Sequence, residues 1–190
     1  ETEPMEIKRV YNFDGVGEKD MYLLHHEEIE SLALNIPGIK RIRFFMTFGQ
    51  SYLTHLKCLE NVGMTSIEPI MYEGKEIIPL QFLKAVLPDP SSLGPRTKGK
   101  TNIGCIFQGK KDGKEKEYFL YQPFDNQESI ERWGTQAVTA QTGFGAALAL
   151  ELIGRGIWKE AGVYAPEYFV PKPYLELMKE SGYKYGIIEK

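Results

Sequence analysis

The dipeptide Asp112-Gly113 lies between two β-rich runs, residues 102–108 and 117–122. It favours a type I′ turn, in which both central residues need a positive φ, and such turns join adjacent antiparallel strands. The lysines around it, from Lys110 to Lys116, are most simply solvated turn residues. The dipeptide therefore predicts a β-hairpin and a sheet that is largely antiparallel.

Several other short segments alternate apolar and polar residues, which predicts strands, and segments with helical periodicity lie between them. Strands are expected at 5–13, 20–25, 41–48 and 183–188. Helices are expected at 27–35, 50–62, 80–87, 126–133, 139–153 and 173–181. This order predicts an α+β fold, with a mixed, largely antiparallel sheet and helices packed on one face.

Three of these helices carry more specific expectations. In the segment 50–62, Leu53, Leu56 and Leu59 have the spacing of an inward-facing stripe. The segment 139–153 is apolar nearly all round, which predicts burial on several sides. Asp125 or Asn126 is expected to cap the helix at 126–133, because a short polar side chain can accept the first free backbone N–H groups.

Length and charge indicate a single domain and argue against a protein that binds nucleic acid or a membrane surface. The 190 residues are 42% hydrophobic with a net charge of -3, which suits one domain spanning 1–190 and gives no basic excess for nucleic acid or a membrane surface. The apolar stretch 144–153 is too short to span a bilayer. Two separate cysteines and no visible signal peptide favour free buried thiols and a cytoplasmic location. The start at Glu1, without methionine, suggests an excised piece of a longer polypeptide.

The run from Pro79 to Gly104 combines a short apolar helix with a Pro/Ser/Gly loop that presents three cations just before a strand. Arg96, Lys98 and Lys100 could clamp a small anion such as an amino-acid carboxylate. A solvated basic loop is the simpler alternative. The pattern alone leaves both interpretations open.

His25-His26-Glu27-Glu28 lies at an expected strand-to-helix junction. It lacks the second histidine on the same helix face that a zinc-protease motif requires, and no other His/Cys cluster supplies metal ligands. No metal site is therefore expected. The carboxylates of Glu27 and Glu28 either support the helix N-terminus or contact a substrate amine.

The segment 141–148, Gln-Thr-Gly-Phe-Gly-Ala-Ala-Leu, only superficially resembles a nucleotide-binding loop. It has Leu148 where a small residue is needed and lacks a strand immediately before it. Close backbone packing at the start of a buried helix, with Thr142 as a possible cap, is the simpler interpretation. A ligand that approaches Thr142 and Gly143 is the alternative.

Four segments, residues 22–32, 41–55, 79–104 and 134–143, together resemble the second, catalytic domain of the saccharopine dehydrogenase-like family. The sequence of residues 79–104 is similar to that of one branch of this family, the carboxynorspermidine dehydrogenases, also called carboxynorspermidine synthases. The resemblance covers nearly the whole chain. It implies a C-terminal domain for substrate binding and homodimerisation, with an N-terminal NADP(H)-binding Rossmann domain that this chain lacks.

The resemblance also implies a reaction, the reductive condensation of aspartate β-semialdehyde with a diamine, 1,3-diaminopropane or putrescine, in polyamine biosynthesis. NADPH would reduce the imine to carboxynorspermidine or carboxyspermidine. The fragment alone would be inactive because it has no hydride donor site. The partners expected are the small-molecule aldehyde and diamine and a second copy packed through an uncovered sheet face.

The chemistry of such a product suggests roles for the candidate residues. Arginine or lysine suits its α-carboxylate, and carboxylates suit its amines. The first role falls to Arg43, Arg96, Lys98 and Lys100, and the second to Glu27, Glu28 and Asp125. Arg43 lies in an otherwise apolar strand, so it either pairs internally or faces the cleft. His26 is the first choice for proton transfer, because imidazole titrates near neutral pH.

Two departures from the branch pattern bear on the substrate. Phe124-Asp125-Asn126 replaces the usual Cys-Asp-His, and the segment 141–145 replaces the usual Thr-Thr-Gly-Val-Pro. Both changes are expected near the substrate, so the amine, the aldehyde or both could differ. The alternatives are a saccharopine-type dehydrogenase of lysine metabolism and a non-catalytic dimerisation or binding module.

Overall fold

The hairpin predicted from Asp112-Gly113 is the longest β-structure in the chain. In a computed structural model, which describes residues 5–190, β6 (Lys100–Lys111) pairs antiparallel with β7 (Lys114–Asp125) along the full length of both strands. Asp112 and Gly113 have φ values of 52° and 76°, as the type I′ turn requires. The short strand β8 (Gly186–Glu189) pairs with the other edge of β7 and completes a three-stranded sheet.

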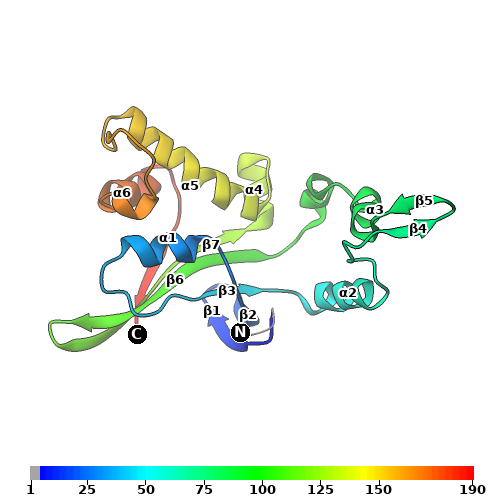
Figure 1. Cartoon of the computed structure of the whole chain (residues 1–190). Helices are drawn as coiled ribbons and strands as arrows, with labels where there is room; N and C mark the ends of the chain where they lie inside the picture. The colour runs from blue at the N-terminus through cyan, green and yellow to red at the C-terminus, as the bar shows by residue number, and fades with distance from the viewer. Residues whose placement is uncertain (1–4) are drawn as a thin grey trace.

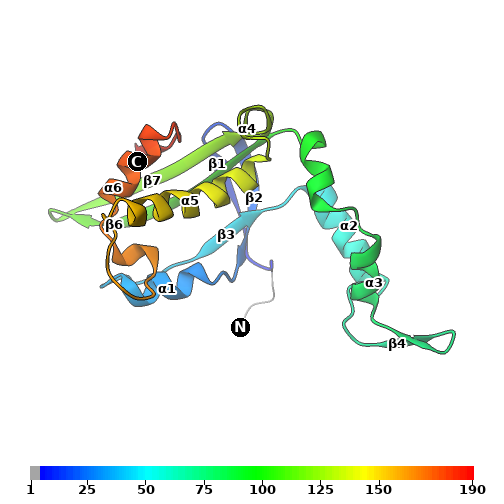
Figure 2. The ribbon, with the colours of Figure 1, turned by 90° about the horizontal axis from the view of Figure 1, so that it is seen from above.

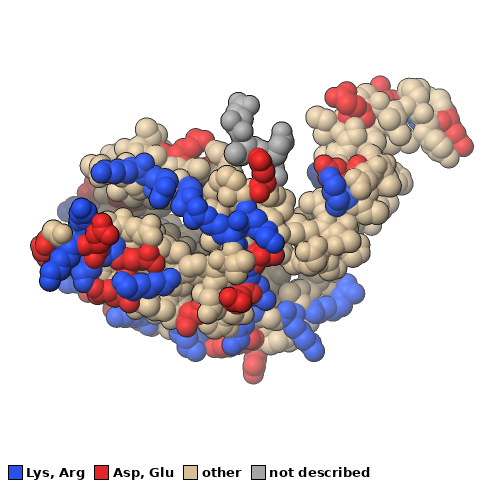
Figure 3. All heavy atoms as spheres, turned by 90° about the horizontal axis from the view of Figure 1, so that it is seen from below, with Lys and Arg blue, Asp and Glu red and all other residues tan. Residues whose placement is uncertain are grey.

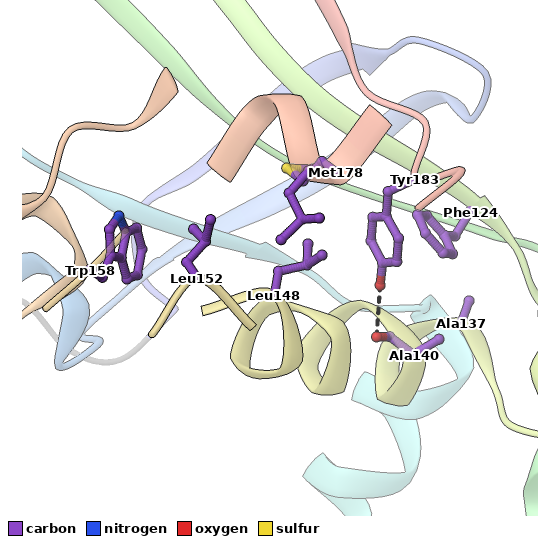
Figure 4. Close-up of a cluster of buried hydrophobic side chains, with 9 residues drawn as sticks. Phe124, Ala137, Ala140, Leu148, Leu152, Trp158, Met178 and Tyr183 are labelled. Carbon is purple, nitrogen blue, oxygen red and sulfur yellow. Dashed lines mark hydrogen bonds between the residues drawn. The ribbon is translucent and has the colours of Figure 1, made fainter. Parts of the chain in front are cut away.

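Three helices pack together beside this sheet and form the core with it (Figure 1). They are α4 (Asn126–Trp133), α5 (Ala137–Gly154) and α6 (Lys172–Glu180). Buried residues of α5, with Leu148 and Leu152 among them, meet Met178 of α6 and Phe124 of β7 (Figure 4). The hydroxyl of Tyr183 donates a hydrogen bond to the carbonyl of Ala140 at 2.8 Å, so this buried phenol has a partner.

A second three-stranded antiparallel sheet packs against the first. It consists of β1 (Lys8–Phe13), β2 (Gly17–Leu24) and β3 (Phe44–Thr47), with α1 (Glu28–Asn35) between β2 and β3. Tyr11 joins the two sheets, because its ring contacts Phe119 and its hydroxyl accepts from Lys190 Nζ at 2.8 Å. Asn102 Nδ2 also donates to the carbonyl of Asp14 at 2.8 Å. We call these two sheets and their helices the body.

Residues 49–87 leave the body and form a separate projection, which we call the arm. It contains α2 (Gln50–Asn61), a hairpin of β4 (Ile70–Tyr72) and β5 (Lys75–Ile77), and α3 (Pro79–Val86). Figures 1 and 2 show that the arm extends away from both sheets in two perpendicular views. Two short 3-10 segments, Pro90–Arg96 and Pro166–Tyr168, lie outside the arm.

The α+β class is confirmed, and the expected helices and strands occur in the expected order, with the hairpin of β4 and β5 as an unpredicted addition. The strands, however, form three antiparallel sheets instead of one mixed sheet. The stripe of Leu53, Leu56 and Leu59 does not reach a core, because α2 has no buried residue. The cysteines, expected to be buried, are free and exposed.

Helix α5 is buried on one side only, which corrects the expectation of burial on several sides. Ala137, Ala140, Gln141, Leu148 and Leu152 face the core, whereas other apolar residues of the helix remain exposed. Within the described residues, Ala137–Gly154 is also the one helix long and apolar enough to cross a membrane, a test that core helices pass as well. Its buried face contributes to the core of the body.

Candidate functional site

The basic loop predicted as an anion clamp is held firmly by a buried asparagine. Asn126, 5% exposed, begins α4 directly after β7. Its Nδ2 donates to the carbonyls of Gly94 and Thr97, and its Oδ1 accepts from the backbone N–H of Ala137 at 2.9 Å. Its own N–H donates to the carbonyl of Gly99 at 2.9 Å. One side chain therefore ties the loop at 94–99 to the start of both α4 and α5.

The three cations of this loop point away from the anchored backbone. Arg96, Lys98 and Lys100 are exposed, and within the described residues no hydrogen bond or ion pair engages their side chains. Lys100 opens β6 opposite Asp125, the last residue of β7. A rigid loop that presents unpaired cations costs little ordering entropy when an anion binds. Each of these cations therefore remains available to pair with an anion such as a carboxylate.

Asp125 caps α4, as the sequence predicted. Its Oδ1 accepts from the N–H groups of Gln127 at 2.9 Å and Glu128 at 3.2 Å. A carboxylate at this position also lies favourably at the positive end of the helix dipole. The capping bonds engage one carboxylate oxygen, and the side chain stays partly exposed beside the basic loop.

The departures from the branch pattern lie largely in the core. The ring of Phe124 packs against Trp133 and Tyr183, and Phe144 contacts the same two rings. Gln141 is buried, where its Oε1 accepts from Thr101 Oγ1 at 2.6 Å and its Nε2 donates to the carbonyl of Gln122 at 3.0 Å. These side chains join β6, β7 and α5 and so position the loop indirectly.

Thr142 does not cap α5, because the helix begins five residues earlier at Ala137. Its hydroxyl donates to the carbonyl of Val138 at 3.0 Å within the helix. Thr142 and Gly143 are exposed on the side of α5 that turns away from the core, and a Cβ added at Gly143 would meet no atom within 4 Å. A ligand or another domain could approach the helix closely at this point.

His26 and its neighbours form a second group at the junction of β2 and α1. The His26 ring lies 4.4 Å from the Phe44 ring between centroids, and its buried Nδ1 has no hydrogen-bond partner. The carboxylate oxygens of Glu27 and Glu28 lie 3.7 and 3.8 Å from this nitrogen, while both carboxylates remain mostly exposed. The histidine ring is therefore packed on Phe44 and lies beside two acidic side chains.

Arg43 lies beside the same junction, because Leu24 of β2 pairs with the next residue, Phe44. Its guanidinium carbon lies 5.7 Å from the centre of the Phe45 ring, and Arg9 lies 5.5 Å from the same ring. Desolvation and the nearby charges of Arg9 and Arg41 lower the pKa of Arg43. Figure 3 shows lysines and arginines gathered in a band across the side of the molecule on which β1–β3 lie.

Arg43 therefore takes part in a cationic cluster with Arg9 and Arg41, for which the described residues supply no ion pair. Neither Arg9 nor Arg41 was singled out from the sequence, although Arg41 is only two residues from Arg43. The buried amides Asn126 and Gln141 were also missed as anchors. The position of Asn126 at a strand-to-helix junction suggested only a cap.

The candidate residues thus form two groups. One lies at the junction of β2 and α1 and just before β3, and it contains His26, Glu27, Glu28 and Arg43. The other lies around the anchored loop and on α5, and it contains Arg96, Lys98, Lys100, Asp125, Thr142 and Gly143. No hydrogen bond or ion pair joins the two groups in residues 5–190. Each group is an open surface of this chain.

Neither of two hollows in the described residues encloses a substrate. A crevice of about 20 Å³ beside Asp125 and Trp133 has room for roughly one water molecule. A larger open groove, lined by residues such as Tyr11, Asp14 and Lys190, contains none of the candidate residues. Among the described residues, no group of three or more His, Cys, Asp or Glu side chains could hold a metal ion.

The segment 141–148 does not form a dinucleotide-binding loop. The segment 141–148 lies inside α5 and not in a turn between a strand and a helix, so its backbone N–H groups are used within the helix. The described surface therefore offers groups for carboxylates and amines and no phosphate-binding turn of this kind.

The sequence is similar to those of known proteins. Residues 1–183 match the family described as the saccharopine dehydrogenase C-terminal domain. Carboxyaminopropylagmatine dehydrogenase of Synechocystis sp. is 46% identical over 182 residues, which are 96% of this chain and 46% of the relative. Carboxynorspermidine synthases of Vibrio cholerae and Vibrio alginolyticus are 39% and 38% identical over 180 residues, 94% of this chain and 43% of each relative. The chain spans about half the length of these curated relatives.

Proposed function

Because the chain belongs to the saccharopine dehydrogenase C-terminal domain family, we propose that it is the substrate-binding part of an NADPH-dependent oxidoreductase of polyamine biosynthesis. The reaction is the reductive condensation of aspartate β-semialdehyde with an amine. Agmatine is the first choice for that amine, and 1,3-diaminopropane and putrescine are the alternatives.

One observation supports agmatine as the amine substrate. The chain is 46% identical to a carboxyaminopropylagmatine dehydrogenase and 39% and 38% identical to two carboxynorspermidine synthases. A carboxyaminopropyl group is what aspartate β-semialdehyde leaves on an amine nitrogen after condensation and reduction. The product name of the first relative therefore combines this aldehyde with agmatine.

The balanced reaction defines what the protein must supply. The amine nitrogen attacks the aldehyde carbon, water leaves, and an imine forms. NADPH, bound outside the described residues, supplies the hydride that the imine carbon accepts, and the nitrogen keeps a proton. The protein must therefore hold one carboxylate and several cationic nitrogens and must manage protons at the new C–N bond.

The two residue groups suit these tasks. The unpaired cations Arg96, Lys98 and Lys100 hold the α-carboxylate of the aldehyde, and the buried Asn126 keeps their loop in place. Glu27 and Glu28 hold the cationic end of the amine, a guanidinium in agmatine. His26, whose side chain is 30% exposed beside Glu27 and Glu28, exchanges a proton with the water or amine.

Arg43 contributes positive charge beside His26, and the cluster that it forms with Arg9 and Arg41 attracts anionic substrate. Asp125 adds a carboxylate beside the basic loop while it caps α4. Thr142 and Gly143 offer an open helix face against which the cofactor-binding part of the protein packs. The substrates then lie between this chain and that part.

The test is the rate of NADPH oxidation by the protein that carries this chain together with its cofactor-binding part. Aspartate β-semialdehyde is offered with agmatine, 1,3-diaminopropane, putrescine or no amine, and lysine with 2-oxoglutarate tests the saccharopine-type reaction. We expect turnover that depends on the amine and is fastest with agmatine. Turnover with only lysine and 2-oxoglutarate, or with no pair of substrates, would contradict the proposal.

Variants test whether the cations of the loop at 94–99 bind the aldehyde. Lys98→Ala should raise the KM for the aldehyde by about tenfold, which corresponds to roughly 1.4 kcal/mol. The matched control is Lys114→Ala, which removes an exposed lysine at the end of the β6–β7 hairpin. Equal effects of both changes would show that the loop cations have no specific role.

A further inference from the structure

An open groove of about 460 Å³ lies between the turn that joins β1 to β2 and the sheet of β6, β7 and β8. Three aromatic rings line it, those of Tyr11, Phe13 and Phe119, and Tyr11 contacts each of the other two edge to face. We call it the aromatic groove. A hollow of this size with apolar walls and a few polar groups is typical of small-molecule sites.

The aromatic groove already holds one cation, the side chain of Lys190. Its Nζ donates to the hydroxyl of Tyr11 at 2.8 Å and lies 3.5 Å from a carboxylate oxygen of Glu117. The same nitrogen lies 4.7 Å from the centre of the Tyr11 ring and 5.8 Å from that of Phe119, both within the range of cation–π attraction. A lysine side chain is a butylammonium ion tethered to the backbone. The groove is therefore complementary to a primary alkylammonium group.

Lys190 occupies only part of the aromatic groove. Its side chain remains 42% exposed, and an ion pair as exposed as this one adds little to the stability of a protein. The groove continues along Asp14 and residues 15–17, with which Lys190 forms no hydrogen bond or ion pair in the part of the chain that the structure describes. A free amine can therefore displace the lysine and use the rest of the groove.

Further acceptors lie at the β1–β2 turn. Asp14 lines the aromatic groove, and a hydrogen bond to its carboxylate raises the pKa of the Tyr121 hydroxyl. Asn102 Nδ2 donates to the carbonyl of Asp14, while Asn102 Oδ1 is buried and has no hydrogen-bond partner within the described residues. A buried acceptor without a donor is costly. The groove thus has one carboxylate beside Lys190, that of Glu117, and another at the turn, where a hydrogen-bond donor is missing.

We propose that the aromatic groove binds the primary ammonium group of an aliphatic amine or diamine, and that Lys190 fills the site when no such ligand is present. The ammonium group of the ligand takes the place of Lys190 Nζ over the rings of Tyr11 and Phe119. The second ammonium group of a diamine lies at Asp14. This site contains none of the residues proposed to bind the reacting amine, and it does not depend on the proposed reaction.

The test observes the groove directly, in the protein that carries this chain together with its cofactor-binding part. The reporter is the side-chain methyl signal of Ile188, which lines the groove, followed by NMR and assigned with Ile188→Val. The probes are n-butylammonium chloride and putrescine dihydrochloride, compared with sodium chloride at equal ionic strength. We expect either amine to shift the Ile188 signal with a saturable dependence on concentration, and sodium chloride to leave it in place.

Variants test the role of Lys190. Lys190→Ala removes the tethered competitor and should lower the dissociation constant of n-butylammonium, read at Ile188, by about tenfold. Adding Glu117→Gln should raise it again by about threefold or more. The matched control is Lys184→Ala, which removes an exposed lysine 3.7 Å from a carboxylate oxygen of Glu128 and should leave the constant unchanged.

The outcomes separate this site from the proposed reaction, because no readout needs turnover. An Ile188 signal that neither amine shifts, or that sodium chloride shifts equally, would overturn the proposal. A dissociation constant that Lys190→Ala leaves unchanged or raises would do so too. The wild-type titration needs no variant, so it decides the proposal even where a substitution disturbs the fold.

Discussion

The body and the arm differ in how their apolar residues are used. In the body, Leu148 and Leu152 of α5 meet residues of α6 and β7, and Tyr183 finds a hydrogen-bond partner within the same core. In the arm, leucines of similar spacing on α2 reach no core. Helix α2 carries a clear apolar stripe, yet that stripe stays uncovered, so the burial of a helix depends on the presence of a neighbouring surface as well as on its sequence pattern. Amphipathic spacing indicates which face a helix buries, and only the tertiary arrangement decides what covers it.

The largest effect should come from removing a core side chain of the body. Leu152 is 1% exposed, and Leu152→Ala should lower the free energy of unfolding by about 3 kcal/mol through lost burial and the cavity left behind. Leu150, two residues earlier on the same helix, is 69% exposed. Leu150→Ala should therefore change the free energy of unfolding by less than about 0.5 kcal/mol. Chemical denaturation measures both. Similar values for the two variants would mean that α5 is covered on both sides.

Loss of the loop anchor should come next. Asn126→Ala removes three side-chain hydrogen bonds at a buried position and should lower the free energy of unfolding by about 2 kcal/mol. Amide hydrogens at 94–99 should also exchange faster. The control Gln127→Ala removes one exposed bond to the Thr97 carbonyl and should cost roughly 0.5 kcal/mol. Unchanged exchange in the loop of the Asn126 variant would refute the anchoring role.

The arm should open locally more often than the body. Helix α2 has no buried residue and Pro79 is the one buried residue of α3, so their backbone amides should exchange at least about tenfold faster than those of α5, a difference of roughly 1.4 kcal/mol in local opening. Hydrogen exchange followed by mass spectrometry measures all three helices in one sample. Equal protection of α2, α3 and α5 would contradict this difference between arm and body.

The smallest effect concerns an exposed ion pair between Lys116 of β7 and Glu189 of β8. The hydrogen bond from Lys116 holds the pKa of Glu189 below its ordinary value of 4.5. A carboxyl with a lowered folded-state pKa stabilises the fold above its unfolded-state pKa, and that contribution is lost as the pH falls through the folded-state value. Lys116→Gln should remove this part of the acid sensitivity in pH-dependent denaturation. An unchanged pH profile would show that solvent screening cancels the pair.

Much of the fold follows from local rules that the sequence displays. Asp112-Gly113 determines the turn of the longest hairpin through its positive φ values, and Asp125 begins α4 by capping it. The one-sided burial of α5 and the projection of the arm could not be predicted in this way. Both depend on which surfaces meet, and the apolar spacing of Leu53, Leu56 and Leu59 is the same with or without a partner.

In the candidate site, too, some residues could be predicted from the sequence and others could not. Charged residues such as Lys98 and Glu27 could be selected from their chemistry, and their exposure fits binding roles. The residues that anchor the loop of Lys98 could not be selected in this way, because Asn126 and Gln141 act through contacts with segments distant in sequence. Arg9 and Arg43 meet over Phe45 only because β1 and β3 belong to the same sheet.

The most direct test of the proposed reaction traces the hydride from NADPH into the product. The protein, with its cofactor-binding part, is supplied with NADPH deuterated at the transferred position, aspartate β-semialdehyde and agmatine, and the product is analysed by mass spectrometry. We expect a carboxyaminopropyl-agmatine product that carries a single deuterium on the carbon bonded to the new nitrogen. A product without deuterium, or the reduced aldehyde with no amine attached, would contradict reductive condensation as the function of this protein.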